Sequence, residues 1–340
     1  MATPRRKIVD EAVTPYYHCI SRCVRKAFRC GQGKEHRKQW IEDRLRELVA
    51  IFAIDCAGFA IMDNHLHVLA RLDSRRAEAW SAEETARRWL TLFPLRAQGG
   101  QPLPLSPARV RQLAEDAAWV ARARRRLCDL GWFMKCLKEP LARRANKEDG
   151  CTGAFWEGRF RSIAVLDEQA LLATAAYIDL NPFAAGAAPL PETANHTSLH
   201  ARIEHCRSNG TLSGVCDDLS TRTRTPLQEQ GLWLLPVDDC RDRGSARAGL
   251  LPGFTLSCYV RLVDWTSRQL RAGKAHLPAD VGSLFDRLRI DPAAWEETLS
   301  RMFAQTRPTG HHFGRRASLR SLARSHGRCW HRASCTLNAA

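Results

Sequence analysis

Residues 56–72, CAGFAIMDNHLHVLARL, form the most informative stretch of the chain. The stretch is mostly apolar, and its second half alternates in the way that is typical of a β-strand. The alternation places His65 and His67 on one face and Leu66 and Val68 on the other. Two imidazoles on one face of a strand can reach the same ion, although such a pair is more often part of a polar surface.

The segments before this strand predict another strand followed by a helix. Residues 16–24, YYHCISRCV, follow Pro15 and mix aromatic with β-branched residues, as strands do. Residues 35–54 carry apolar side chains at helical spacing, with charged residues between them. The first part of the chain is therefore expected to alternate between strands and a helix.

The segments that follow predict further helices and one more strand. Residues 132–146 have a helical pattern, and residues 154–165, AFWEGRFRSIAV, are aromatic and basic and end like a strand. A further helix is expected to begin near Glu168. We expect it to end near Asn181, because Pro182 disfavours helical geometry in the residue before it.

This last helix carries the second notable feature, the sequence YIDLNP at residues 177–182. Tyr177 and Asn181 are four residues apart and are thus neighbours on one helix face. Considered singly, each has an ordinary explanation, since a tyrosine at a helix end usually packs on the core and an asparagine commonly caps the terminus.

The charge of the chain favours a polyanionic partner such as nucleic acid. There are 52 Lys and Arg residues against 36 Asp and Glu, a net charge of +16. Each phosphate that such a protein neutralises releases condensed counterions, which drives binding. No stretch approaches the ~20 apolar residues of a membrane span, and the start MATPRRKIVDEA lacks the apolar core of a signal peptide. The 13 cysteines contain no Cys-x-x-Cys pair, which fits reduced thiols in a cytoplasm.

In the order of its elements the chain resembles the single-tyrosine HUH transposases, and among them the REP-associated tyrosine transposases. MDNHLHVL resembles their His-hydrophobic-His strand. FWEGRFRS followed by AAYIDLNPFAAG resembles the segment around their catalytic tyrosine. The resemblance covers about residues 14–186, apart from an insertion.

The resemblance implies a fold, a reaction and a set of site residues. The fold would be α+β, a ferredoxin-like antiparallel sheet with helices on one face and the histidine pair facing the tyrosine helix. Tyr177 would attack a phosphodiester of single-stranded DNA, leaving a 5′-phosphotyrosine and a free 3′-OH. His65, His67 and Asn181 would hold Mg²⁺ or Mn²⁺ beside it. No small-molecule cofactor is expected.

The resemblance and the basic composition together predict DNA contacts near the tyrosine. The basic side chains expected to contact phosphates are Arg22, Arg25, Lys26, Lys135, Lys138, Arg143, Arg144, Arg159 and Arg161. Trp156 and Phe160 are candidates for stacking on unpaired bases, although core packing is slightly favoured for both. Ala184 stands where relatives often have an arginine, and Asp63 stands where they commonly have a proline.

The composition also predicts how the chain is divided. Residues 1–190 are expected to form the catalytic domain, with a helical insertion at about residues 74–130 that is rich in Arg, Ala and Trp. A linker is expected at residues 191–225. Residues 226–340 would form a mostly helical basic extension with a disordered tail.

Three functions remain open at this point. The leading one is a transposase that cuts and rejoins single-stranded or hairpin DNA, as a monomer or homodimer, in the cytoplasm of a bacterium and associated with the nucleoid. The second is a regulatory DNA-binding protein that retains the fold but no longer cuts. The third is an RNA-binding module that uses the same basic and aromatic surface.

Overall fold

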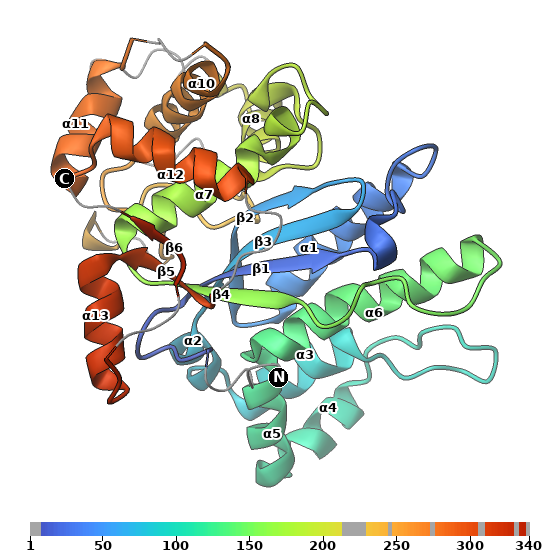
Figure 1. The fold of residues 1–340 in the computed structure, drawn as a ribbon. Helices are drawn as coiled ribbons and strands as arrows, with labels where there is room; N and C mark the ends of the chain where they lie inside the picture. Colours follow the sequence, from blue (N-terminus) through green and yellow to red (C-terminus); the bar gives the residue numbers. More distant parts are fainter. Residues whose placement is uncertain are drawn as a thin grey trace.

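The computed structural model describes residues 8–212, 229–243, 247–272, 276–304, 310–329 and 333–337. Its centre is a β-α-β-β-α-β unit, blue to green in Figure 1. This unit consists of β1 (Tyr16–Arg22), α1 (His36–Ile51), β2 (Ile54–Ile61), β3 (His65–Leu72), α6 (Leu130–Glu148) and β4 (Arg161–Val165). The four strands are antiparallel in the order β2-β3-β1-β4, which is the ferredoxin-like arrangement. The predicted α+β fold class is confirmed.

Different helices cover the two faces of this sheet. The expected layer of helices is formed by α1 and α6, and Tyr17 and Val68 are fully buried against it. Helix α7 (Glu168–Ala184) adds a second layer on the other face. His18 and His67 project toward α7. The alternation along the strands thus separates an apolar face from a face that carries histidines.

Helix α7 is buried along most of its length, because it lies between the sheet and the C-terminal helices (Figure 1). Asp167 caps its first turn by accepting a hydrogen bond from Ala170 N at 3.0 Å. The helix continues through Pro182 to Ala184, so the predicted end near Asn181 is wrong. A proline inside a helix costs about 3 kcal/mol. Burial of the last turn, including Pro182 itself, offsets that cost.

The insertion between β3 and α6 forms four short helices. They are α2 (Ser74–Glu78), α3 (Ala82–Leu92), α4 (Pro107–Ala114) and α5 (Ala117–Leu127). Ser81, Ser106 and Asp116 each accept a hydrogen bond that caps a helix start. Leu90 and Val110 belong to a small core of the insertion's own. In Figure 1 these helices lie beside α6, on the side of the sheet away from α7.

The chain after α7 folds back over that helix. Residues 198–208, which the sequence analysis assigned to a linker, form helix α8, because Leu199, Arg202 and Cys206 are buried at helical spacing. Residues 213–225 of the expected linker lie outside the described residues. The remaining elements of this part are 3-10 helices η3 (Pro191–Thr193) and η5 (Arg241–Arg243), and helices α10 (Leu256–Ala272), α11 (Ala279–Leu288) and α12 (Pro292–Ala304).

Part of the tail that was expected to be disordered joins the sheet. Strands β5 (His312–Arg315) and β6 (Ala333–Leu337) run parallel to β4 and extend the order to β2-β3-β1-β4-β5-β6, with helix α13 (Arg316–Ser325) between them. Gly314 is required here, since a Cβ would lie 2.8 Å from Asp167 Oδ2. That same carboxylate accepts a hydrogen bond from Arg315 N at 2.7 Å, so β5 is tied to the start of α7.

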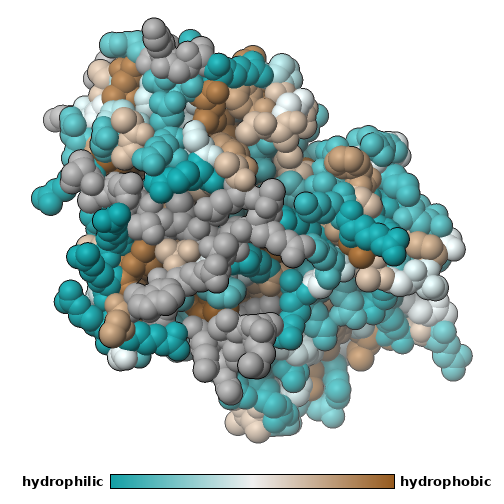
Figure 2. Space-filling view, in the orientation of Figure 1, coloured by the Kyte–Doolittle hydropathy of each residue, from teal (hydrophilic) through white to brown (hydrophobic). Residues whose placement is uncertain are grey.

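The surface drawn in Figure 2 is largely hydrophilic wherever it is coloured. Within the described residues, no helix is both long and apolar enough to cross a membrane. A short 3-10 helix, η2 (Val24–Lys26), and an extended loop connect β1 to α1. This connection lies next to the site that is described below.

Candidate active site

Three imidazoles and one phenol meet between the sheet and α7. Strands β1 and β3 are neighbours with Ile20 opposite His67, so His18 and His67 come from adjacent strands. The ring centroid of Tyr177 lies 5.5 Å from that of His67 and 6.0 Å from that of His18. The centroids of His65 and His67 are 4.8 Å apart. The fold therefore brings together the histidine pair and the tyrosine that stood out in the sequence.

The ring of His65 is oriented by its chain neighbour. Asn64 Nδ2 donates to the carbonyl of Lys26 at 3.2 Å, which leaves Asn64 Oδ1 to contact His65 Nδ1 at 2.6 Å. An amide oxygen can only accept, so the proton of His65 lies on Nδ1 and the lone pair on Nε2. Burial, assisted by the charge of Arg22, lowers the pKa of His65 to about 4. The imidazole is thus neutral and its Nε2 can bind a cation.

The ring of His67 is held by a second histidine. His18 Nε2 and His67 Nδ1 are 2.8 Å apart, and the two rings are stacked with centroids 5.1 Å apart. Burial lowers the pKa of His18 to about 3 and that of His67 well below its usual range. His67 Nε2 is buried and has no hydrogen-bond partner among the described residues. A buried nitrogen without a partner is unfavourable unless something else binds to it.

Tyr177 and Asn181 face this cluster from one turn of α7. Asn181 Nδ2 donates to the Tyr177 carbonyl at 3.2 Å, and the Asn181 side chain also forms hydrogen bonds with the side chains of His65 and Tyr177. Burial raises the pKa of the Tyr177 hydroxyl, while a hydrogen bond with Asn181 and the charge of Arg22 act in the opposite direction. The phenol is therefore protonated at neutral pH and needs help to act as a nucleophile.

The cluster brings together the three residues that the resemblance implies as ligands of a divalent cation, His65, His67 and Asn181. The described residues contain no group of three or more His, Cys, Asp or Glu that could hold a metal, and the set implied by the resemblance has an amide oxygen as its third ligand. The ligand atoms would be Nε2 of His65, Nε2 of His67 and the amide oxygen of Asn181, and here the Asn181 side chain is hydrogen-bonded to His65. The partnerless Nε2 of His67 is the observation that favours a bound ion. Three such ligands leave positions open for phosphate oxygens and water.

Two of the predicted DNA-binding arginines lie close to this cluster. Arg22 ends β1 directly opposite His65, and its charge acts on both His65 and Tyr177. Arg161 begins β4, where its Nη2 donates to the Gly310 carbonyl at 2.5 Å. Burial and the charge of Arg22 lower the pKa of Arg161, which indicates that the two guanidinium groups are near each other. Together they make this edge of the cluster positive.

Three of the predicted DNA contacts are not placed to touch DNA. Trp156 and Phe160 are only 9% and 8% exposed and belong to the core on the α1–α6 face, so their ring faces are not free to stack. Lys138 is equally buried, and its Nζ donates to the Gly158 carbonyl at 2.9 Å. Core packing was the alternative already considered for Trp156 and Phe160, and both rings lie in the core.

The other predicted contacts are exposed but differ in position. Arg25 and Lys26 lie on the connection between β1 and α1, near His65, and Arg159 is exposed just before β4. Lys135, Arg143 and Arg144 lie on α6, which packs on the opposite face of the sheet from Tyr177. These last three side chains are thus separated from the tyrosine by the sheet.

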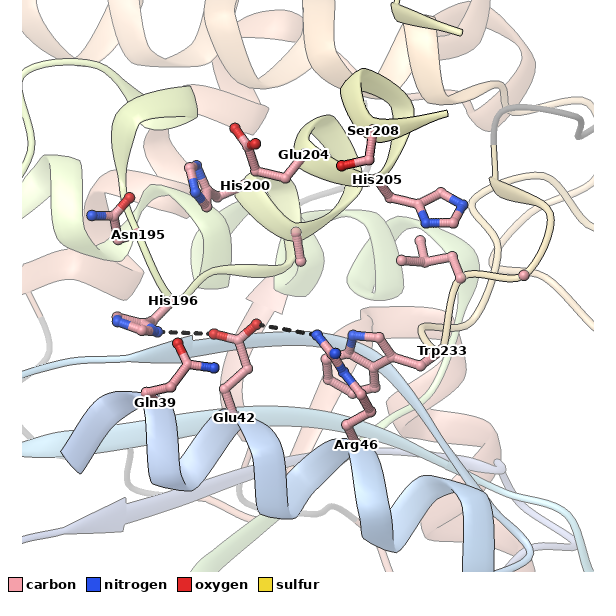
Figure 3. A pocket seen from close by; sticks show the side chains of 13 residues that line it. Gln39, Glu42, Arg46, Asn195, His196, His200, Glu204, His205, Ser208 and Trp233 are labelled. Atoms are coloured by element: carbon pink, nitrogen blue, oxygen red, sulfur yellow. Dashed lines mark hydrogen bonds and ion pairs between the residues drawn. The ribbon is translucent and has the colours of Figure 1, made fainter. Parts of the chain in front are cut away.

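One cavity adjoins the cluster at His65, and it shares Asn195 and His196 with a second cavity. One, of about 460 Å³, has His65 and Pro182 in its wall. The second, of about 640 Å³, is shown in Figure 3. There α1 contributes Glu42, which lies 2.8 Å from His196 Nδ1, and α8 contributes the facing wall. The second cavity lies between α1 and α8, and Asn195 and His196 separate it from the cavity at His65.

Sequence reasoning missed three residues of this site. Asn64 directly precedes His65, and His18 lies within the strand predicted at residues 16–24, whose alternation already places it on the face of Ile20. Phe303 of α12 packs its ring on Tyr177 with 4.9 Å between centroids. No local pattern in the sequence connects Phe303 with a helix so far from it along the chain.

We compared the chain with models of protein families, with curated proteins and with solved structures. None of them matches. The assignment of a function therefore depends on the geometry of the site.

Proposed function

We propose that this protein cuts and rejoins single-stranded DNA through a covalent bond to Tyr177, as the resemblance to HUH transposases implies. The observation that carries the proposal is the meeting of the Tyr177 ring with His65 and His67, where the buried Nε2 of His67 has no hydrogen-bond partner among the described residues. Asn181 completes the arrangement one helical turn after the tyrosine. The net charge of +16 supports a nucleic acid as the substrate.

The chemistry that this arrangement can perform is a phosphoryl transfer. A divalent cation held by His65, His67 and Asn181 would neutralise the phosphate charge and favour departure of the 3′ oxygen. Tyr177 Oη forms a bond to phosphorus as the bond from phosphorus to the 3′ oxygen breaks. The phenolic proton leaves to solvent, and the 3′ oxygen gains a proton. Because the phosphotyrosine keeps the energy of the broken bond, a 3′-OH can reverse the step without ATP.

Arg22 is suited to assist this step. Its positive charge lies close enough to favour the phenolate form of Tyr177, whereas burial disfavours it. A phosphate next to the tyrosine would also be attracted by Arg22 and Arg161. The tyrosine is on the last part of α7, where the helix dipole disfavours an anion by about 0.3–1 kcal/mol, and these two charges oppose that effect.

The test is formation of a covalent adduct. Full-length protein is incubated with end-labelled single-stranded hairpin DNA and Mn²⁺, then denatured and analysed by electrophoresis. We expect a labelled band at the mass of the protein, absent with EDTA and absent for Tyr177→Phe. Tyr16→Phe is the matched control, since Tyr16 is also partly buried but donates to the Gly249 carbonyl, away from this cluster. An adduct formed by Tyr177→Phe would rule out Tyr177 as the nucleophile.

A second function is favoured by one observation. The Phe303 ring covers Tyr177, and burial raises the pKa of its hydroxyl, as expected for a protein that binds DNA without cutting it. Ala184, where relatives often have an arginine, points in the same direction. Tight binding of the hairpin without any adduct in Mn²⁺ would establish this second function.

A further inference from the structure

The connection between β1 and α1 is fastened to the turn that precedes β3. Lys26 has a φ of 55°, which non-glycine residues seldom adopt, and its carbonyl accepts a hydrogen bond from Asn64. Four residues later, Cys30 N donates to the Asp63 carbonyl at 2.8 Å. The backbone on both sides of Phe28 is thus held in place next to the candidate site.

Phe28 itself points outward from this connection. Its side chain is 50% exposed, the highest exposure among the large apolar residues of the described chain. The ring forms part of the wall of the 460 Å³ cavity, and His65 and Pro182 form another part of the same wall. A cavity of this size is within the range of sites that bind small molecules. The exposed ring therefore lines the same cavity as one candidate metal ligand, His65.

The charge around Phe28 is suited to a phosphate backbone. Arg25 and Lys26 are exposed on this connection, and Arg22 and Arg29 are also basic, whereas Lys34 pairs with Asp149 and Glu35 adds one acidic side chain to the wall of the cavity. The acidic Asp63 at the cavity is neutralised by Lys38, whose Nζ lies 2.6 Å from it. An exposed aromatic ring among exposed cations is how proteins hold single strands, since every base has a face on which to stack.

We propose that Phe28 is a stacking platform for one unpaired nucleobase of the DNA strand, beside the nucleotide whose phosphate lies at Tyr177. The proposal rests on the proposed function for its substrate. The ring face takes the base, Arg25 and Lys26 contact the flanking phosphates, and the cavity accommodates the base edge next to His65. A base within a duplex is already stacked on both sides and cannot use this ring, so Phe28 selects for single strands.

The experiment measures binding rather than cleavage. A labelled oligothymidylate, which cannot form a hairpin, is titrated with full-length protein in EDTA, and a duplex of the same length is titrated in parallel. Removing one stacked base costs about 1–3 kcal/mol, or roughly 5- to 150-fold in affinity. We expect Phe28→Ala to lose this much affinity for the single strand and little for the duplex. Phe28→Trp should retain binding, and Phe28→Leu should behave like Phe28→Ala.

The matched control is Phe93→Ala. Phe93 is also a large exposed residue, at 41%, but it lies on the insertion after α3. Phe93→Ala should leave the affinities for the single strand and for the duplex unchanged. Equal single-strand affinity for Phe28→Ala and wild type would overturn the proposal, as would an equal loss for the duplex. Adduct formation by the wild-type protein is measured separately. If Phe28→Ala weakens single-strand binding but the wild type never forms an adduct, the cleavage reaction is disproved and the stacking role of Phe28 still holds.

Discussion

His18 Nε2 lies 2.8 Å from His67 Nδ1, and both rings are buried. If His67 binds a cation through Nε2, its proton has to be on Nδ1, and His18 is the group that accepts it. Histidine ligands in proteins usually donate their second N–H to such a partner, and loss of the partner weakens metal binding about 10- to 100-fold. We expect His18→Leu to weaken Mn²⁺ binding by this factor.

The measurement is the fraction of free Mn²⁺ from its electron paramagnetic resonance signal as protein is added. His18→Gln keeps an acceptor and should recover part of the affinity, which a merely space-filling role would not require. If His18→Leu binds Mn²⁺ as tightly as wild type, His18 does not orient His67.

Protonation of the buried histidines should make the metal-free protein acid-sensitive. The pKa of His18 is lowered to about 3 and that of His67 is lowered well below 6.5, because burial disfavours the charged form. In the unfolded chain both titrate near their ordinary pKa of about 6.5. Below that pH the unfolded state binds protons that the folded state does not, so the free energy of unfolding falls as pH falls.

At pH 5 the expected loss relative to pH 7 is about 2 kcal/mol for His18, and His67 adds to it in the same direction. Urea unfolding in EDTA at pH 7, 6 and 5 measures it. His18→Leu should show a shallower dependence on pH, and His276→Gln, at an exposed position, should follow wild type. A urea midpoint for wild type that does not change between pH 7 and 5 would contradict this account.

Asp179 attaches α7, the helix that carries Tyr177, to later segments of the same chain. Its carboxylate is buried and accepts hydrogen bonds from Ser198 Oγ at 2.6 Å, from Leu199 N at 2.9 Å and from the hydroxyl of Tyr259. Exchange of this helix between two copies would have to break all three. We therefore expect Tyr177 to act with the histidines of the same chain.

Mixing two defective proteins tests this expectation. Tyr177→Phe is combined with a protein that carries both His65→Ala and His67→Ala, and the mixture is assayed for the covalent adduct. Since neither chain has a complete site, no adduct should form. Recovery of a clear fraction of wild-type adduct would show that two copies share their tyrosine helices.

The buried ion pair between Arg202 and Glu229 joins α8 to the segment that follows it. Arg202 also donates to the Ala57 and Leu235 carbonyls at 3.1 and 2.7 Å. Arg202→Leu would leave the buried Glu229 carboxylate without its partner, at a cost of about 3–5 kcal/mol in the free energy of unfolding. Urea unfolding measures this cost.

The same helix offers the control. Arg207 pairs with Glu204 at the surface, so Arg207→Leu should change stability little. Equal effects of the two substitutions would mean that the buried pair has no special role.

The sequence was most informative where the spacing of apolar and polar residues was regular. The alternation in β3 placed His65 and His67 on one face, and the structure has them there, because a strand with one apolar face can take only one register. The spacing of Tyr177 and Asn181 likewise placed them on one side of α7. Local periodicity is enough for such placements.

Other features depend on contacts between distant parts of the chain. The helix passes through Pro182 because α7 is buried on both sides, and Trp156 is in the core although its segment looks like a basic surface. Strand β5 pairs in parallel with β4 across almost 150 residues of chain. Patterns within a short segment do not contain this information.

The ring of Phe303, which packs on Tyr177, is synthesised later than the other residues of the site. The histidines, the tyrosine and Asn181 all precede residue 182, whereas Phe303 follows Tyr177 by more than 120 residues. At roughly 5–20 residues per second, the ribosome takes on the order of 6–25 s to add that length. During this interval a nascent chain whose sheet and α7 have emerged carries the Tyr177 ring without the Phe303 ring packed on it, and the speed of translation sets how long that state lasts.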